Sequence, residues 1–304
     1  MHFLTLGFFV ISLGSACTSW AQTTTLQGVV VAAGTKEAVP FAVVELRSKK
    51  IGTQASATGG FTLPIPQALT ASDTIHVSAL GYVAQQFTGV TSPCKLVLLP
   101  RAVTLEEVVI RAPVSGKQVF GPTARKSYAS WGSTGRAAER GGFEVARFFH
   151  PAAEGTIQRV AYFISAHQEC KGQSGAPFRV RVYAADGPDG MPGTDLLTTT
   201  ILTAAKRPGW HTVALNSGIQ FPAQGFYVAM EWVYTAPQFS CSRTIVSSGQ
   251  QATHISYGQL LGCIEEEKQN CWYYSPGYGW RQHRWPASHS NGFINPLIQA
   301  QVEL

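Results

Sequence analysis

The sequence predicts an all-β protein built from two consecutive β-sandwiches. Apolar and polar residues alternate over short runs, glycine and proline interrupt these runs, and no long stretch carries apolar residues at helical spacing. The chain of 304 residues contains 30 glycines and 17 prolines, and only 13% of its residues are charged. A hydrophobic fraction of 45% is enough to fill a core, which excludes the disordered class. The length accommodates two ordinary domains.

The N-terminus, residues 1–21, has the pattern of a signal peptide. The run Phe3–Leu13 is apolar but too short to span a bilayer, and Ser19–Ala21 is a small-x-small cleavage sequence. A second interpretation is a degraded lipobox, in which Cys17 carries a lipid anchor although Gly14 stands where leucine is preferred. We therefore expect an exported protein in the periplasm, at the outer-membrane surface or in the medium, with no transmembrane segment in the mature chain.

Residues 25–100 are expected to form the first sandwich, from about seven short strands. Strands are predicted at Leu26–Val31 and Val39–Leu46. In the second of these, alternate residues fall on opposite faces, so that one set faces a core and the other faces solvent or a neighbour. Gly59-Gly60 permits a positive φ in a tight turn, which lets the following strand fold back onto the sheet.

This order of strands and turns closely resembles the carboxypeptidase-regulatory-like domain, a small transthyretin-like β-sandwich of secreted and outer-membrane proteins from Bacteroidetes-type bacteria. The best local match is Ser78-Ala79-Leu80-Gly81-Tyr82, and Leu105–Ile110 is similar to the Leu-x-Glu-Val-Val-like segment that follows the family's last strand. Where the family usually has Thr-Asp before the glycine turn, this chain has Ala55-Ser56 and lacks the capping Asp. The resemblance implies a non-catalytic scaffold or docking module. In TonB-dependent receptors the module precedes a plug and a barrel, and we expect neither here.

The remaining chain is expected to form a linker and a second sandwich. Residues 101–142 are rich in Gly, Ser, Ala and Arg without a strong period, so we interpret them as a linker with a leading strand. Residues 143–304 are predicted to be strands throughout, with examples at Ile157–Ile164, Phe178–Tyr183 and Trp210–Leu215. The strand spacing and aromatic positions are similar to those of a jelly-roll or lectin-like sandwich.

Six cysteines favour an oxidising compartment. Cys263 and Cys271 flank a short polar loop, so we expect a local disulfide between them. Cys170 and Cys241 follow predicted strands and are expected to form a second bridge across the sandwich. A zinc site is the alternative, but the sequence contains no C-x-x-C pair.

No catalytic motif is present, and we expect neither enzymatic activity nor a cofactor. A zinc carboxypeptidase needs a Glu three residues after a His, and no His here has one. The segment Gly172–Gly175 does not have the Gly-x-Ser-x-Gly pattern of a nucleophile elbow. The basic residues behind the formal charge of +6 are scattered, which argues against nucleic acid and leaves a weak attraction to anionic polysaccharide or lipid headgroups.

A Gly-rich loop supplies the best candidate ligands for a metal ion: Asp186, Asp189 and Asp195. Several carboxylates on one loop can give calcium its oxygen ligands, but their spacing is not that of an EF-hand. The alternative, which the sequence favours, is a long hairpin loop whose Asp and Gly residues make turns.

The densest aromatic run of the chain supplies the candidate ligand site. Sugars stack their apolar faces on Trp or Tyr rings, while planar polar side chains hold the hydroxyls. We therefore predict binding of a glycan or another cell-surface component, with five contact residues: Trp272, Tyr274, Trp280, Arg284 and Trp285. One alternative is a hairpin whose alternate rings fill the core. A second is an assembly role, in which exposed sheet edges pair with an outer-membrane protein.

Overall fold

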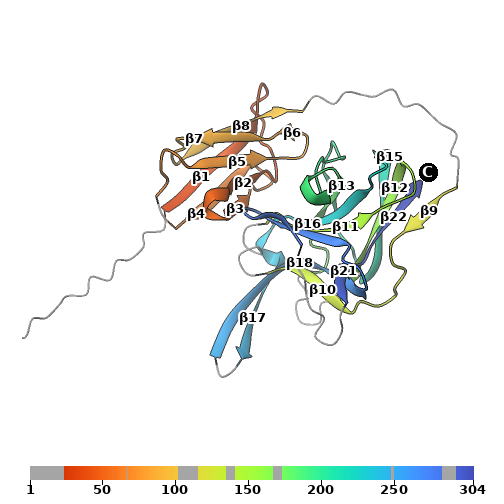
Figure 1. Ribbon diagram of the computed structural model, residues 1–304. Helices are drawn as coiled ribbons and strands as arrows, with labels where there is room; N and C mark the ends of the chain where they lie inside the picture. Colours follow the sequence, from red (N-terminus) through yellow and green to blue (C-terminus); the bar gives the residue numbers. More distant parts are fainter. Residues whose placement is uncertain are drawn as a thin grey trace, which may run out of the picture.

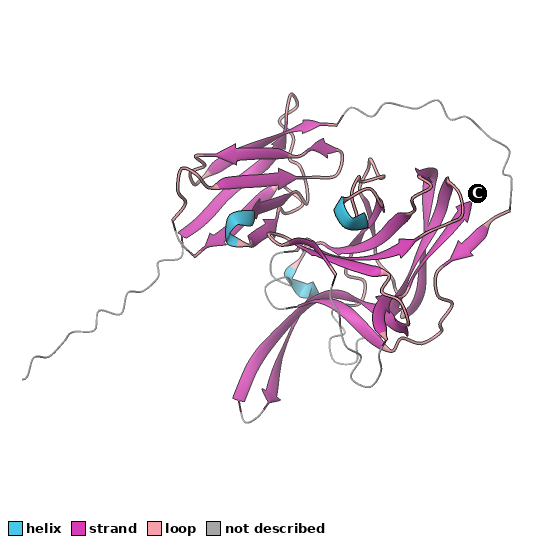
Figure 2. Ribbon diagram, in the orientation of Figure 1, coloured by secondary structure: helices cyan, strands magenta, loops and turns pink. Residues whose placement is uncertain are grey.

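The computed structural model describes residues 24–66, 68–101, 116–134, 141–166, 173–247, 250–282 and 292–304. The fold is all-β, as predicted, and two layered units of strands lie side by side (Figures 1 and 2). The described helices are three short 3-10 turns: η1 (Arg47–Lys49), η3 (Pro188–Gly190) and η4 (Pro237–Phe239). None of the described helices is long and apolar enough to cross a membrane.

The N-terminal sandwich consists of two four-stranded sheets. The first has the order β4 (Gly60–Ile65), β1 (Thr24–Ala32), β8 (Cys94–Pro100) and β6 (Tyr82–Val83). The second has the order β3 (Ile51–Gln54), β2 (Val43–Leu46), β5 (Thr74–Ser78) and β7 (Gln85–Thr88). Apolar side chains from both sheets form one buried core, which includes Val30, Val44, Leu63, Ile75 and Leu98. Each sheet therefore buries one face against the other.

Two local features of this sandwich follow from backbone conformation. Gly59 has a φ of +75°, and a Cβ placed on it would lie 2.6 Å from the carbonyl oxygen of Val30, so the predicted glycine turn is confirmed. The strand expected at Val39–Leu46 was predicted too long, because Phe41 has a φ of 56° and the ladder begins only at Val43.

The C-terminal sandwich pairs an eight-stranded sheet with a six-stranded one. The eight-stranded sheet contains β10 (Ala129–Thr134), β18 (Gln250–Glu266), β12 (Gly155–Ser165), β22 (Ile298–Glu303), β9 (Gln118–Phe120), β15 (Gly209–Phe221), β17 (Ser240–Ser247) and β21 (Phe293–Pro296). The six-stranded sheet has the order β14 (Ile201–Thr203), β13 (Phe178–Ala184), β16 (Phe226–Trp232), β11 (Phe143–Phe149), β19 (Cys271–Ser275) and β20 (Gly279–Arg281). Strands β17 and β18 form a long hairpin that projects from the body (Figure 1).

Two strands of this sandwich, β9 and β10, fall in the segment 101–142 that was expected to be mainly a linker. They pair with β22 and β18, so the described part of this segment from β9 onward belongs to the C-terminal sandwich. Phe120 and Trp131 pack against its core, whereas Tyr128 is exposed.

Side chains alternate along each strand of the six-stranded sheet and define its two faces. The inward face buries residues such as Val145, Val180 and Met230 against the eight-stranded sheet. The outward face carries charged and aromatic side chains instead, beginning with Arg179 and Arg181. This outward face meets the N-terminal sandwich and positions the candidate site.

Candidate functional site

One continuous row of polar and aromatic side chains crosses the outward face of the six-stranded sheet. Residues in register on neighbouring strands lie side by side and interact directly. The register aligns one residue from each of β13, β16, β11, β19 and β20: Arg179, Glu231, Glu144, Tyr274 and Trp280. The sheet therefore gathers charges and rings from distant parts of the sequence.

Two arginines share one buried carboxylate at the start of this row. Arg179 donates from Nε and Nη2 to both oxygens of Glu231 at 2.7 and 2.6 Å, and Arg181 donates to the same carboxylate at 2.8 Å. Arg181 also donates to Asp195 at 2.6 Å. Only 1% of the Arg179 side chain and none of the Glu231 side chain is exposed. Because a buried charge without a partner is costly, each member of the network depends on the others.

The neighbouring carboxyl of Glu144 differs from that of Glu231 in the direction of its pKa shift. It accepts a hydrogen bond from the Tyr183 hydroxyl at 2.7 Å, while Arg181 stays 3.7 Å away. Burial, together with the negative charge of Glu231, raises the pKa of Glu144 to about 7. Burial opposes ionisation of Glu231 too, but the Arg179 and Arg181 guanidiniums outweigh it and hold that pKa below its ordinary value. Glu231 is thus ionised at neutral pH, where Glu144 titrates.

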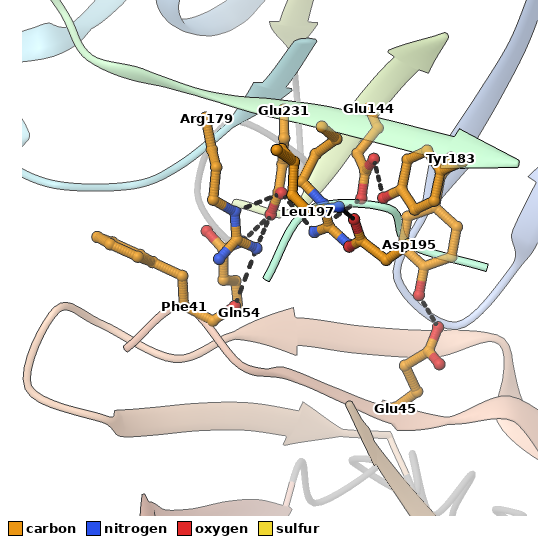
Figure 3. Close-up of polar contacts among 11 residues, drawn as sticks. Phe41, Glu45, Gln54, Glu144, Arg179, Tyr183, Asp195, Leu197 and Glu231 are labelled. Carbon is orange, nitrogen blue, oxygen red and sulfur yellow. Dashed lines mark hydrogen bonds and ion pairs between the residues drawn. The ribbon is translucent and has the colours of Figure 1, made fainter. Parts of the chain in front are cut away.

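The N-terminal sandwich contributes directly to this network. Gln54 donates from Nε2 to Glu231 at 2.5 Å, and the Arg179 guanidinium lies 5.7 Å from the centre of the Phe41 ring (Figure 3). Phe41, two residues before β2, therefore faces a neighbour, the second sandwich, which was one of the two options that the sequence alternation allowed.

Glu45 forms a second link between the sandwiches. Its Oε1 accepts hydrogen bonds from the Tyr274 hydroxyl and from the backbone N–H of Gly277, each at 2.7 Å. Its Oε2 accepts from Arg47 at 2.8 Å. Burial and the Glu45 charge raise the pKa of Tyr274 well above its ordinary value, so this hydroxyl stays a donor.

The turn of the β19–β20 hairpin packs tightly on strand β3. A Cβ on Gly277, whose φ is +87°, would lie 2.5 Å from the Ile51 backbone. A Cβ on Gly52 would lie 2.6 Å from the ring of Pro276. Neither position has room for a side chain, so the two backbones meet at van der Waals distance.

A cleft of about 900 Å³ opens beside these contacts, between the two sandwiches. Strand β2, η1 and the ends of β5, β6 and β8 line its N-terminal wall, and β13, the loop ending at Asp195 and the β19–β20 hairpin line the other. Its aromatic lining consists of Tyr82, Tyr183, Tyr274, Tyr278 and Trp280. Its cationic lining consists of Arg47, Lys50, Arg101, Arg179, Arg181 and Arg281.

The predicted ligand residues separate into three groups. Tyr274 and Trp280 both line the cleft, with the Trp280 ring centre 5.4 Å from the ring centres of Tyr183 and Tyr274. Trp272 lies on the same face and packs, half-buried, against a cluster that includes Tyr183. Arg284 and Trp285 lie outside the described residues. The aromatic run does form a hairpin, and its alternate residue Tyr273 packs against the core.

The acidic loop uses its side chains to fix its own shape. Asp186 accepts hydrogen bonds from the N–H and hydroxyl of Thr194 at 2.7 and 2.6 Å, and Asp195 is held by Arg181. Asp189 adopts a left-handed φ of 55° in η3. No group of three or more His, Cys, Asp and Glu side chains in the described ranges is arranged to hold a metal ion. This geometry favours the turn interpretation over calcium.

The disulfide predicted between Cys263 and Cys271 is wrong in this structure, where both thiols are free and buried. The two residues belong to different sheets, β18 and β19, and each Sγ donates to a separate carbonyl, Leu261 O at 3.5 Å and Ile294 O at 3.4 Å. Nearness in sequence does not orient two side chains toward each other when the strands that carry them lie in different layers. The second predicted bridge involves Cys170, which lies outside the described residues, so its pairing with Cys241 stays a prediction.

Sequence reasoning missed the charged residues of the network. The signal was present in the run Phe178–Tyr183, where two arginines alternate with valines and so share one face. Glu231 stands within the apolar run Phe226–Val233, where a single buried carboxylate needs a partner. Those two observations together indicate a buried ion pair, although not its link to the first sandwich.

Comparison with known proteins matches the first sandwich to a family. Residues 26–110 match the CarboxypepD_reg-like domain. No curated protein matches the sequence. Among solved structures, the chain is similar to the clostridial cysteine protease Cwp84, with 12% identity, a TM-score of 0.36 and coverage of 83% of this chain and 51% of that chain.

Another similar structure is that of the Gx strain of infectious bursal disease virus, with 12% identity, a TM-score of 0.26 and coverage of 82% of this chain and 55% of that chain. The chain therefore spans about half the length of the solved structures it matches. The strand order, the glycine turn and the family match agree with one another for the first third of the chain, and we conclude that residues 26–110 of this protein are a CarboxypepD_reg-like domain.

Proposed function

We propose that this protein is an exported, non-enzymatic glycan-binding protein and that the glycan occupies the cleft between the two sandwiches. The observation that carries the proposal is the ring-lined volume of about 900 Å³, a size typical of ligand sites. The CarboxypepD_reg-like domain supplies one wall, and the second sandwich supplies the aromatic hairpin as the other.

The cleft offers the two kinds of contact that a saccharide needs. Tyr278 is 50% exposed and Trp280 is partly exposed, so their rings are available to stack on the apolar faces of sugar rings. The arginines of the lining donate hydrogen bonds, and the Tyr183 and Tyr274 hydroxyls, which already donate to Glu144 and Glu45, can accept them. The ion network holds Arg179 and Arg181 in place, which reduces the entropy lost on binding.

The carboxyls of the cleft favour binding over hydrolysis. Glycoside hydrolysis needs two free carboxyl groups on either side of the scissile bond. Here Glu144 is 3% exposed and bonded to Tyr183, and Asp195 is engaged by Arg181 and by the N–H of Leu197. We therefore expect capture of a saccharide without turnover.

A glycan array tests the proposal directly. The wild type is compared with Trp280→Ala and Tyr278→Ala, and Tyr128→Ala serves as a matched control because Tyr128 is 56% exposed and does not line the cleft. We expect both cleft variants to lose at least about tenfold in affinity for the glycans that the wild type binds, as ring anchors do. Equal loss in the Tyr128 variant, or no binding by the wild type, contradicts the proposal, as does release of free sugar.

A further inference from the structure

The charges of the cleft do not balance. Its six cationic side chains face four carboxylates, two in the lining and two directly behind it: Glu144, Asp195, Glu45 and Glu231. Glu231 and Asp195 are taken up by Arg179 and Arg181. The lining thus has more positive charge than its own carboxylates neutralise.

Three cations of the lining are left without an acidic partner. Lys50 and Arg101 are exposed, and neither makes an ion pair within the ranges that the structure describes. Arg281 also makes no ion pair there, and its guanidinium lies over the rings of Tyr278 and Tyr273, at 4.4 and 4.9 Å from their centres. Stacking leaves the edge of a guanidinium free to donate hydrogen bonds to an anion.

These three cations come from separate elements on both walls. Lys50 directly follows η1 and Arg101 directly follows β8 in the N-terminal sandwich, whereas Arg281 lies on β20 in the C-terminal one. A single small anion does not meet charges spread over both walls of a 900 Å³ cleft. An extended ligand with repeated negative charges does, and it would bridge the two sandwiches.

We infer that the ligand is an acidic oligosaccharide, carrying carboxylate or sulfate groups along its chain, whose charges are read by Lys50, Arg101 and Arg281. This inference rests on the proposed function and names the class of its glycan. The aromatic rings can stack equally well on uronate and on neutral sugars. The three cations attract only the charged sugar, so they distinguish the two ligands. Single-stranded nucleic acid combines rings and charge as well, so binding of an oligothymidylate in place of the saccharides is one outcome of the test below.

Calorimetric titration with defined oligosaccharides tests the inference. A hexuronate tetrasaccharide and a sulfated tetrasaccharide are compared with a neutral tetrasaccharide of the same linkage, at low and high salt. We expect an acidic ligand to bind at least about tenfold more tightly than the neutral one and to weaken as salt rises. The uronate and sulfate arms identify which anion is preferred.

The variants Lys50→Gln and Arg101→Gln should each weaken acidic binding by about three- to tenfold and weaken neutral binding by less, so that the preference for the acidic ligand falls. Lys36→Gln is the matched control, because Lys36 is also an exposed lysine with a left-handed φ, 60° against 52° for Lys50, but does not line the cleft. Equal binding of acidic and neutral sugars, still lost in Trp280→Ala, overturns the inference and leaves the proposed function standing. Binding only to an oligothymidylate or to phosphatidylglycerol vesicles overturns both.

Discussion

Glu45 and Tyr274 stand 229 positions apart in the chain, yet the Tyr274 hydroxyl donates a 2.7 Å hydrogen bond to the Glu45 carboxylate. One residue belongs to the CarboxypepD_reg-like domain and the other to the aromatic hairpin of the second sandwich. The bond is charge-assisted and largely buried, which makes it stronger than a neutral surface contact. It fixes the hairpin against the first domain and so shapes the wall of the cleft.

Removing the hydroxyl of Tyr274 should weaken the contact between the two sandwiches and so lower the free energy of unfolding. In Tyr274→Phe the Glu45 carboxylate keeps Arg47 and the Gly277 N–H but loses its third donor. A buried hydrogen bond to a charged group contributes about 1.5 to 3 kcal/mol, so urea unfolding should show a loss of that size. Tyr82→Phe is the control, because no hydrogen bond of that hydroxyl occurs among the described contacts, and it should change stability by less than about 0.5 kcal/mol. Equal stability of the Tyr274 variant and the wild type would contradict this assignment.

Breaking the buried Arg179–Glu231 ion pair should lower the free energy of unfolding more than breaking an exposed ion pair does. Arg179→Met leaves Glu231 with one guanidinium instead of two, and loss of one partner of a buried pair costs about 3 to 5 kcal/mol. The exposed pair of Lys117 and Glu303, 3.7 Å apart, supplies the comparison, and Lys117→Met should cost less than about 1 kcal/mol. The unfolding free energy of each variant follows from the midpoint and slope of its urea transition. Equal losses of unfolding free energy in the two variants would contradict the stabilising role assigned to the network.

Glu144 should make stability depend on pH in a defined direction. Its folded-state pKa of about 7 lies above the ordinary value of 4.5, so the folded state binds the proton more tightly than the unfolded state does. The contribution of Glu144 to the free energy of unfolding is fully present below about pH 4.5. It is lost as pH rises through 7, a change of about 3 kcal/mol. The difference in unfolding free energy between the wild type and Glu144→Gln should therefore fall over this window. A difference that stays flat, or rises with pH, would contradict the raised pKa.

The two buried thiols should be chemically free. Burial raises the pKa of Cys271 to about 12 and that of Cys263 well above its ordinary value, so neither reacts readily in the folded protein. Alkylation after unfolding without a reductant, followed by peptide mass analysis, should find both residues modified. A peptide pair cross-linked through these two cysteines would restore the local disulfide that the sequence suggested.

The sequence predicted the strand character of the chain but not what covers each strand. Alternation in the sequence around β2 placed Phe41 and Glu45 in one set but left open whether solvent or a neighbour lay there, because period-2 patterns carry no information about distant partners. The same alternation placed Arg179 and Arg181 together without revealing Glu231 as their shared partner. Contacts between residues such as Glu45 and Tyr274 depend on how two separately folded sandwiches dock, which no local pattern encodes.

The candidate site was predicted in part for the same reason. The aromatic hairpin was found from its composition, and two of its predicted contact residues, Tyr274 and Trp280, do line the cleft. The opposite wall, with Lys50 and Arg101, was not predicted because those residues occur in turns and strand ends without any motif. The Cys263–Cys271 disulfide failed because proximity along the chain says nothing about the layer to which each strand belongs.

The central claim is that a glycan is held between the two sandwiches. Hydrogen–deuterium exchange with and without a saturating saccharide tests this claim most directly. We expect slower exchange on both walls at once, in residues 43–50 of the first domain and 274–281 of the hairpin, with no change in the β17–β18 hairpin. Protection confined to one sandwich, or found only outside the cleft, would contradict the claim.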